Sequence, residues 1–275
     1  MKRSEFLGEL LGTFILVLFG TGSVAVTVLF GAHQGLFQIG IIWGIGVTLA
    51  IYMTRHLSCA HLNPAVTIAM IASGRMIVKK APYYIAAQFL GAFIAGLVVY
   101  GLFSGMISAF EASNGIVRGT FESVETAKMF GEYYNQPGKL AEVPIGLAIV
   151  TEAFGTFLLV LVIFLFTESC NVGKPDDALT PLFIGLTVTS IICLLAPLTQ
   201  AGLNPARDFS PRLVALIFGW GKWAFPDKYG GAFWVYILGP VIGGLVAAFI
   251  FTKIIEPALN RKKEADSSCQ CYAGK

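Results

Sequence analysis

The tripeptide Asn-Pro-Ala occurs twice in this chain, at residues 63–65 and 204–206. Each copy follows a leucine and opens an apolar stretch too short to cross a bilayer, at residues 64–73 and 205–218. Proline suits the first turn of a helix, where its missing N–H would be unpaired anyway, and asparagine suits the N-cap before it. A ten-residue helix is about 15 Å long, half the thickness of a bilayer's hydrocarbon. The motif therefore predicts two half-helices that enter a membrane and meet near its middle.

The rest of the chain is mostly apolar sequence of membrane-spanning length. Of its 275 residues, 56% are hydrophobic and 13% are charged, whereas a soluble domain carries roughly 25% charged residues. A helix needs about 20 residues to cross the hydrocarbon, and six runs qualify: residues 6–30, 36–54, 81–103, 144–167, 178–198 and 231–255. The first run lacks an early cleavage site and is expected to stay as a helix rather than act as a signal peptide. The predicted fold class is an all-α polytopic membrane protein with six transmembrane helices and two re-entrant half-helices.

The two halves of the sequence are related. The stretch ELLGTF at residues 9–14 recurs as EAFGTF at 152–157, an offset of 143 that is close to the 141 between the tripeptides. Three spans separate the copies, so the halves are inverted in the membrane, and such repeats with broken helices place a transport site at their interface. We assign residues 1–255 to one channel domain, with repeat one at about 5–105 and repeat two at about 144–255. Residues 256–275 are expected to form a disordered tail.

Basic residues set the expected orientation. With six spans both termini lie on one side of the membrane, which collects twelve of the 19 Lys and Arg residues, against seven on the other side. Because cytoplasmic loops carry the excess of positive charge, both termini are predicted to be cytoplasmic. The connection 105–143 then lies outside, and residues 123–134 are expected to form a short surface helix. The net charge of +3 is small and argues against a nucleic-acid partner.

The segments around the tripeptides, HLNPAVT at 61–67 and GLNPARD at 202–208, resemble the paired signatures of the aquaporin, or major intrinsic protein, family. The aspartate at 208, GIVRG at 115–119 and GWG at 219–221 are similar to the glycerol facilitator (aquaglyceroporin) branch. The resemblance covers nearly the whole chain. It implies an aquaporin-like fold, a homotetramer with one pore per subunit and a location in the cell (inner) membrane. It implies a passive channel for glycerol and other small neutral solutes, with some water permeability and with no cofactor, metal or enzymatic activity.

Both tripeptides are assigned to the midpoint of the pore. The two asparagines can cap their half-helices and still present a side-chain N–H to the lumen, where a water or polyol oxygen accepts it. The positive ends of the half-helices converge there and raise the barrier for cations and protons. The alternative is that the asparagines are helix caps only. The predicted midpoint residues are Asn63, Pro64, Ala65, Asn204, Pro205 and Ala206.

The resemblance places the selectivity filter, the narrow outer part of the pore, at Trp43, Ile192, Ala201 and Arg207. A cation in a membrane domain is expensive and usually lines a polar pathway; the alternative for Arg207 is a structural salt bridge. Trp43 is expected to form an apolar wall opposite that donor, or alternatively to face lipid. Glycerol facilitators usually carry Gly at the Ile192 position and an aromatic residue at the Ala201 position. This departure resembles plant nodulin-type intrinsic proteins, which pass metalloid acids and glycerol.

Four further residues are assigned to structural support. Glu9 and Glu152 lie inside apolar spans, where an unpaired carboxylate would be costly. The resemblance implies that they accept hydrogen bonds from the backbone of the loops before the half-helices; a proton relay is the alternative. His61 is expected to brace the inner half of the pore, with a pH gate as the alternative, and Asp208 to brace its loop. Cys269 and Cys271 in the tail receive no function.

Two other readings of the function stay open. A channel of the same family that prefers water or metalloid acids is favoured by Ile192 and Ala201. A secondary active transporter is compatible with inverted repeats and intramembrane carboxylates, but no intramembrane carboxylate has the cationic partner that coupling needs. The sequence offers no Ser/His/Asp, metal-ligand or phosphate-loop constellation, so an enzyme is not expected.

Overall fold

The structure is a computed structural model that describes residues 3–137, 141–226 and 230–261. Within these residues, six helices are long and apolar enough to cross a membrane: Arg3–Phe30, Leu36–Thr54, Val78–Ser113, Ile145–Thr167, Thr180–Thr199 and Gly231–Arg261. They match the six predicted runs and confirm the predicted fold class. The third helix continues ten residues past its predicted end at residue 103, and the last one continues to Arg261, so residues 256–261 are helical rather than part of a disordered tail.

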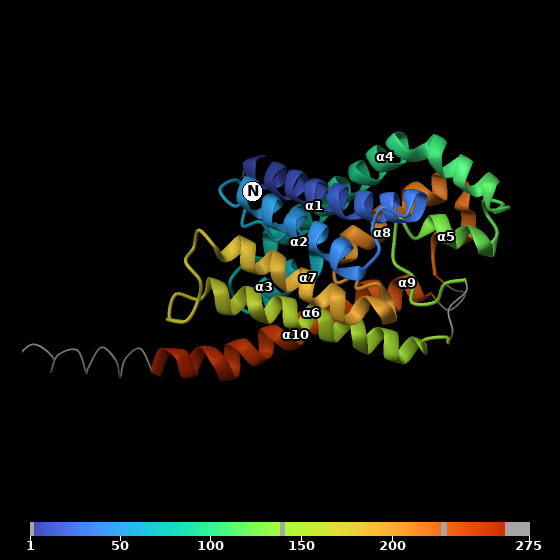
Figure 1. Cartoon of the computed structure of the whole chain (residues 1–275). Coiled ribbons are helices and arrows are strands. Elements are labelled where there is room, and N and C mark those ends of the chain that lie inside the picture. Colours follow the sequence, from blue (N-terminus) through green and yellow to red (C-terminus); the bar gives the residue numbers. More distant parts are fainter. Residues whose placement is uncertain (1–2, 138–140, 227–229, 262–275) are drawn as a thin grey trace, which may run out of the picture.

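The spans are built from the following elements, in chain order: α1 (Arg3–Phe30), α2 (Leu36–Thr54), a 3-10 turn at Val78–Lys80 with α4 (Ala81–Ser113), α6 (Ile145–Thr167), α7 (Thr180–Thr199), and α9 (Gly231–Phe233) with α10 (Gly239–Ile250). Wide π-helical turns at Trp234–Leu238 and Phe251–Ile255 flank α10 in the last span. Figure 1 shows that the start of α1 and the end of the last span lie at the same end of the bundle. We call this the inner end and the opposite one the outer end.

The two short helices predicted after the tripeptides are present. They are α3 (Pro64–Ala72) and α8 (Pro205–Ala215), and each has its tripeptide asparagine as the N-cap and proline at its first position. The helical turn that continues α8, Leu216–Trp220, is broken at Phe218 and Gly219, where the backbone leaves helical geometry. Gly219 has a φ of 106°, which a residue with a side chain rarely adopts.

The helices pack as two related halves. In repeat one α1 packs against α2 and α4, and in repeat two α6 packs against α7 and α10. Across the halves α2 packs against α7, α3 against α10, and α4 against α8. Each half-helix is therefore held by a long helix of the other repeat, which brings α3 and α8 together inside the bundle.

Glycines at equivalent positions allow the closest helix contacts. A Cβ on Gly91 of α4 would lie 2.2 Å from the carbonyl oxygen of Leu10, and one on Gly243 of α10 would lie 1.9 Å from that of Ala153. Both separations are shorter than any real contact of a Cβ, so both helix pairs depend on a missing side chain. This shared detail follows from the internal repeat.

The outer connection differs from its prediction. Of the expected surface helix at residues 123–134, only the start is helical, as a turn at Phe121–Ser123 and the short α5 (Val124–Ala127), and the rest folds inward. Glu132 and Tyr133 are buried, and their backbone N–H groups donate to Asp208 (2.8 Å) and to the Gln200 side chain (2.6 Å). These long-range acceptors replace the carbonyls that a continued helix would have used. Residues 262–275, with Cys269 and Cys271, lie outside the described residues.

Candidate functional site

The two asparagines link the half-helices to each other. Each caps its own helix, since Asn63 Oδ1 accepts from Ala65 N at 2.8 Å and Asn204 Oδ1 accepts from Ala206 N at 3.0 Å. Each also donates to the opposite repeat: Asn63 Nδ2 to the Leu203 carbonyl at 2.9 Å, and Asn204 Nδ2 to the Leu62 carbonyl at 2.8 Å. An amide nitrogen carries two N–H groups, so one remains on each asparagine for a solute. The arrangement therefore provides two donors where the two positive helix ends converge.

The loops that lead into the half-helices have an uncommon backbone. Ala60 and Leu62 before α3, and Ala201 and Leu203 before α8, have φ between 50° and 60°. Residues with side chains occupy this left-handed region at a cost and persist there only when the surroundings impose it. In both loops these two residues with positive φ are separated by one other residue, so this backbone geometry is common to the two repeats.

Buried glutamates impose this geometry. Glu9 accepts from the backbone N–H groups of His61 (3.0 Å) and Leu62 (2.8 Å). Glu152 accepts from those of Gly202 (2.8 Å) and Leu203 (2.7 Å). These are the contacts that the resemblance implies. Each carboxylate satisfies the donors of a loop that has no regular secondary structure at the depth of the membrane.

The inner loop has an additional polar network. The Glu9 carboxylate also accepts from Ser58 Oγ at 2.8 Å and from Gln88 Nε2 at 2.7 Å. Gln88 Nε2 also lies 3.0 Å from the hydroxyl of Thr67, and His61 Nδ1 lies 3.3 Å from the same hydroxyl. His61 therefore bonds to α3, as expected for a residue that braces the inner half of the pore.

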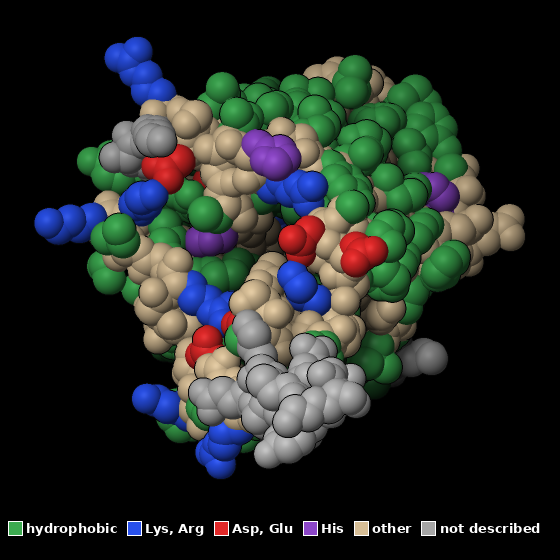
Figure 2. All heavy atoms as spheres, turned by 90° about the vertical axis from the view of Figure 1, so that its left-hand side faces the viewer, with side chains coloured by type: hydrophobic (Ala, Val, Ile, Leu, Met, Phe, Trp, Pro, Cys, Tyr) green, Lys and Arg blue, Asp and Glu red, His purple; other side chains and the backbone are tan. Residues whose placement is uncertain are grey.

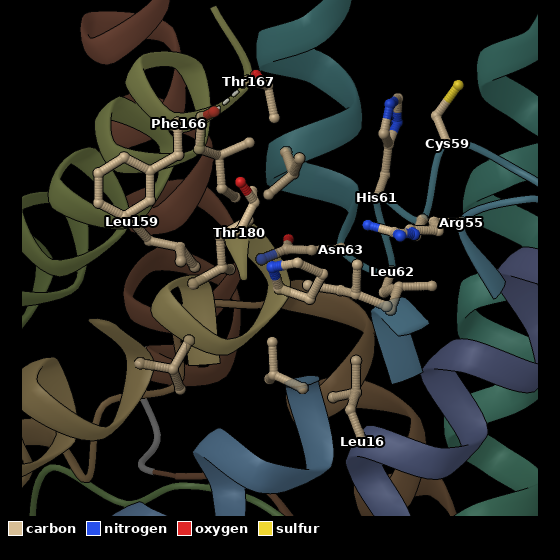
Figure 3. A pocket seen from close by; sticks show the side chains of 18 of the residues that line it. Leu16, Arg55, Cys59, His61, Leu62, Asn63, Leu159, Phe166, Thr167 and Thr180 are labelled. Atoms are coloured by element: carbon tan, nitrogen blue, oxygen red, sulfur yellow. Dashed lines mark hydrogen bonds between the residues drawn. The ribbon is translucent and has the colours of Figure 1, made fainter. Parts of the chain in front are cut away.

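A cavity of about 780 Å³ is bordered by both predicted midpoint asparagines, whereas Pro64, Ala65, Pro205 and Ala206 are not among its described lining residues. It begins at the inner end beside Arg55, Lys174 and Asp177, and Figure 2 shows this end hollowed near its centre and bordered by charged and histidine side chains. The cavity passes both asparagines and reaches all four predicted filter residues. Its lining mixes apolar side chains such as Leu16 and Leu159 with polar ones such as His61, Thr167 and Thr180 (Figure 3).

The predicted filter residues Arg207 and Trp43 stack on each other rather than lying as two opposed walls. The guanidinium carbon of Arg207 lies 4.0 Å from the centre of the Trp43 indole, which is van der Waals contact. Trp43 is 4% exposed and therefore does not face lipid. A Cβ on Gly20 of α1 would lie 2.2 Å from the indole, so this glycine provides its space. Ile192 and Ala201 line the cavity together with this stack.

Arg207 also forms a buried ion pair that the sequence did not indicate. Its Nη1 contacts Oε1 of Glu132, and both side chains are 4% exposed. The alternative, a structural salt bridge, is therefore present, and the same residue lines the cavity, while its role in the filter stays a prediction. Burial raises the pKa of the Glu132 carboxyl, and the adjacent charge of Arg207 opposes that rise. Glu132 is one of several acids in a long loop, 75 positions before its partner, so no spacing or periodicity could single it out.

Asp208 is buried in a second ion pair behind the constriction. Its carboxylate accepts from Nε and Nη2 of Arg212, both at 2.8 Å, and from the backbone of Glu132. Arg212 is fully buried and donates further to the carbonyls of Ala224 and Glu132. Asp208 thus holds the outer loop against α8 and does not line the cavity described above.

A sequence model of the major intrinsic protein family matches residues 2–251. The chain belongs to the major intrinsic protein family. This assignment confirms the recognised resemblance and the interpretation as a membrane channel rather than an enzyme.

Similar proteins within the major intrinsic protein family include two glycerol uptake facilitator proteins. The one from Pseudomonas aeruginosa is 42% identical over 248 residues, covering 89% of this chain and 86% of the relative. The one from Escherichia coli strain K12 is 40% identical over 257 residues, covering 92% and 88%. The propanediol uptake facilitator of Salmonella typhimurium is 39% identical over 251 residues, covering 90% and 92%. An X-ray structure of the aquaglyceroporin from Plasmodium falciparum matches with a TM-score of 0.79 at 31% identity, covering 94% and 98%.

Proposed function

We propose that this chain is a passive channel that lets glycerol and other small neutral solutes diffuse across a membrane. The observation that carries the proposal is the continuous cavity that runs from a charged inner mouth past Asn63 and Asn204 to Arg207, with apolar side chains lining it between these polar groups. A polyol presents hydroxyls on one side and carbon on the other, so it suits a lining of this kind. Relatives named for glycerol and propanediol uptake support the same class of solute.

Ion exclusion follows from the same lining. A bare ion that enters the cavity loses hydration that mostly apolar walls cannot replace. The converging half-helix ends and the asparagine donors disfavour cations at the midpoint and orient water in opposite directions on its two sides. Active transport is less supported, because the backbone of the pore loops already binds both intramembrane glutamates, Glu9 and Glu152.

The test is stopped-flow light scattering on liposomes that contain the purified chain. We expect glycerol permeability well above that of empty vesicles, and uptake that equilibrates without accumulating. A glycerol permeability equal to that of empty vesicles would remove the proposal, and accumulation driven by a pH or sodium gradient would favour a transporter.

A second candidate is a channel of the same family that prefers water or metalloid acids such as boric or arsenous acid. It is favoured by the aliphatic Ile192 and the small Ala201 beside the Trp43–Arg207 stack. The larger side chain is here at position 192 and the smaller one at 201, whereas glycerol facilitators usually have the larger side chain at the position of Ala201. The same vesicles, challenged with water, glycerol, urea and boric acid, rank the candidates directly.

We further propose a homotetramer in the cell (inner) membrane with both termini in the cytoplasm. Large apolar side chains are exposed on the outer faces of the bundle, for example Leu102, Leu194 and Phe249, and these suit lipid or neighbouring subunits. The excess of Lys and Arg on the inner side supports the orientation. Native mass spectrometry of the detergent-solubilised chain, and protease access to a C-terminal tag in sealed vesicles, test the two statements separately.

A further inference from the structure

Four charged residues gather behind the outer constriction and balance each other. They are Glu132, Arg207, Asp208 and Arg212, and we call them the outer charge cluster. Each is at most 4% exposed. Two are cations and two are anions, so the formal charge of the cluster is zero. A buried charge is tolerated where it is paired and hydrogen-bonded, and each of these is paired within the cluster.

Glu132 is fixed in this cluster at three points. Its backbone N–H donates to Asp208 Oδ1 at 2.8 Å, its carbonyl accepts from Arg212 Nη2, and its carboxylate accepts from Arg207 Nη1. Because residues of α8 bind both the N–H and the carbonyl of Glu132, its carboxylate has a defined position relative to that helix. Fixed acceptors of this kind determine the rotamer of the group that they bind.

Only Arg207 of the cluster borders the described cavity, and Glu132 lies behind it. The guanidinium is therefore held between the Glu132 carboxylate and the Trp43 indole. Within the described part of the chain, the guanidinium donates to a protein side chain only through Nη1, to Glu132. Its other N–H groups are left for solute oxygens. The carboxylate thus determines which donors face the lumen.

We infer that Glu132 is the positioning residue for Arg207, and that its carboxylate cancels the charge of this arginine so that the outer constriction is electrically neutral. This inference rests on the proposed channel function. It differs from the simpler view in which an unopposed arginine repels cations, because a neutral ion pair repels neither sign at a distance. Ions are then excluded at this point because they lose hydration that the pore walls do not replace. The charges of Arg207 and Glu132 neutralise each other.

The experiment compares R207A with the double variant R207A/E132Q. Removal of the Arg207 side chain opens the space between Glu132 and the lumen, so that water reaches the carboxylate, keeps it ionised and leaves a negative charge that attracts cations. We expect R207A to raise potassium leak into liposomes by about tenfold, and R207A/E132Q to return it to within about twofold of the wild type. Potassium is followed with an enclosed indicator dye, and glycerol permeability is measured on the same vesicles.

The matched control is Glu125, an acid of the same outer loop whose partner is Lys128. R207A/E125Q is expected to leak like R207A. Equal potassium leak in R207A and R207A/E132Q, or no leak in R207A vesicles that still conduct glycerol, would overturn the inference. Wild-type vesicles without glycerol permeability would instead remove the proposed function.

A second variant covers the case in which R207A does not assemble. E132Q leaves Arg207 without its counter-charge, so chloride leak is expected to rise by about tenfold. Its water-to-glycerol permeability ratio is also expected to change, because the guanidinium is released from its position, whereas a purely structural role would lower both permeabilities together. An E132Q channel with the chloride leak and permeability ratio of the wild type would contradict the inference.

Discussion

The inner and outer halves of the pore share one frame and differ in charge. Both halves use an Asn-Pro-Ala cap, a buried glutamate under the loop and a glycine at the helix crossing. The inner half-helix α3 carries no charged residue, whereas α8 carries Arg207, Asp208 and Arg212. The comparison teaches that the repeat gives both halves the same backbone arrangement, and that of the two half-helices only the outer one carries charged side chains.

The largest expected effect comes from removing Arg212. R212M leaves the Asp208 carboxylate and two carbonyls without their partner, and breaking a buried ion pair costs about 3–5 kcal/mol. We expect a strongly lowered melting temperature in detergent. The residue of the inner half that corresponds to Arg212, by the 141-residue spacing of the tripeptides, is Ile71. I71M is expected to lower the free energy of unfolding by less than about 1.5 kcal/mol. Equal melting shifts for the two variants would contradict the contrast between the halves.

A smaller and equal effect is expected from the two crossing glycines. G91A and G243A each place a Cβ against a carbonyl oxygen, and overpacking of this kind costs about 1–3 kcal/mol. Gly22 in α1 has open space around it, and G22A is expected to be neutral or stabilising by up to about 1 kcal/mol. Thermal unfolding of the three variants is the measurement. A large difference between G91A and G243A would show that the halves do not share this contact.

The features that both repeats share could be predicted from the sequence, whereas the contacts of the charged residues around α8 could not. The spans and the half-helices could be predicted, because membrane length, helix capping and an internal repeat each leave a local pattern. The glutamate contacts were expected because the family resemblance implies them. The outer charge cluster was not, because it joins Glu132 to α8 through a loop without periodicity. The expected surface helix at 123–134 was wrong for the same reason, since α8 and Gln200 take over its backbone donors.

The assignment of the filter residues stays a prediction, and substitutions of two corresponding isoleucines test it. Ile192 lines the cavity beside the predicted filter, and Ile51, which lies 141 positions earlier as the tripeptides do, lines it beside Arg55. I192A is expected to raise the erythritol-to-glycerol permeability ratio by about threefold, because a methylene-scale change in a tight apolar pocket alters selection modestly. I51A is expected to leave the ratio unchanged. Stopped-flow light scattering with both polyols decides, and an identical response of the two variants would move the constriction away from Ile192.

The smallest effect is expected at the charged inner mouth. Arg75 pairs with Glu168 and, at 3.1 Å, with Glu256, whose side chain is 34% exposed. Surface ion pairs contribute about 0–1 kcal/mol and are screened by salt. E256Q should therefore lower the melting temperature slightly at low salt, not at high salt, and leave glycerol permeability intact. A large loss of stability or of permeability would place an essential charge at the inner end as well.

The central claim is that α3 and α8 meet at Asn63 and Asn204 and leave a lane for a neutral solute beside them. A cryo-electron microscopy map of the full chain in lipid nanodiscs with glycerol tests it most directly. The account predicts solute density within hydrogen-bonding distance of both asparagine Nδ2 atoms, continuous with density beside Trp43 and Arg207. A map in which either asparagine faces lipid or bulk water, with no lane between the half-helices, would contradict it.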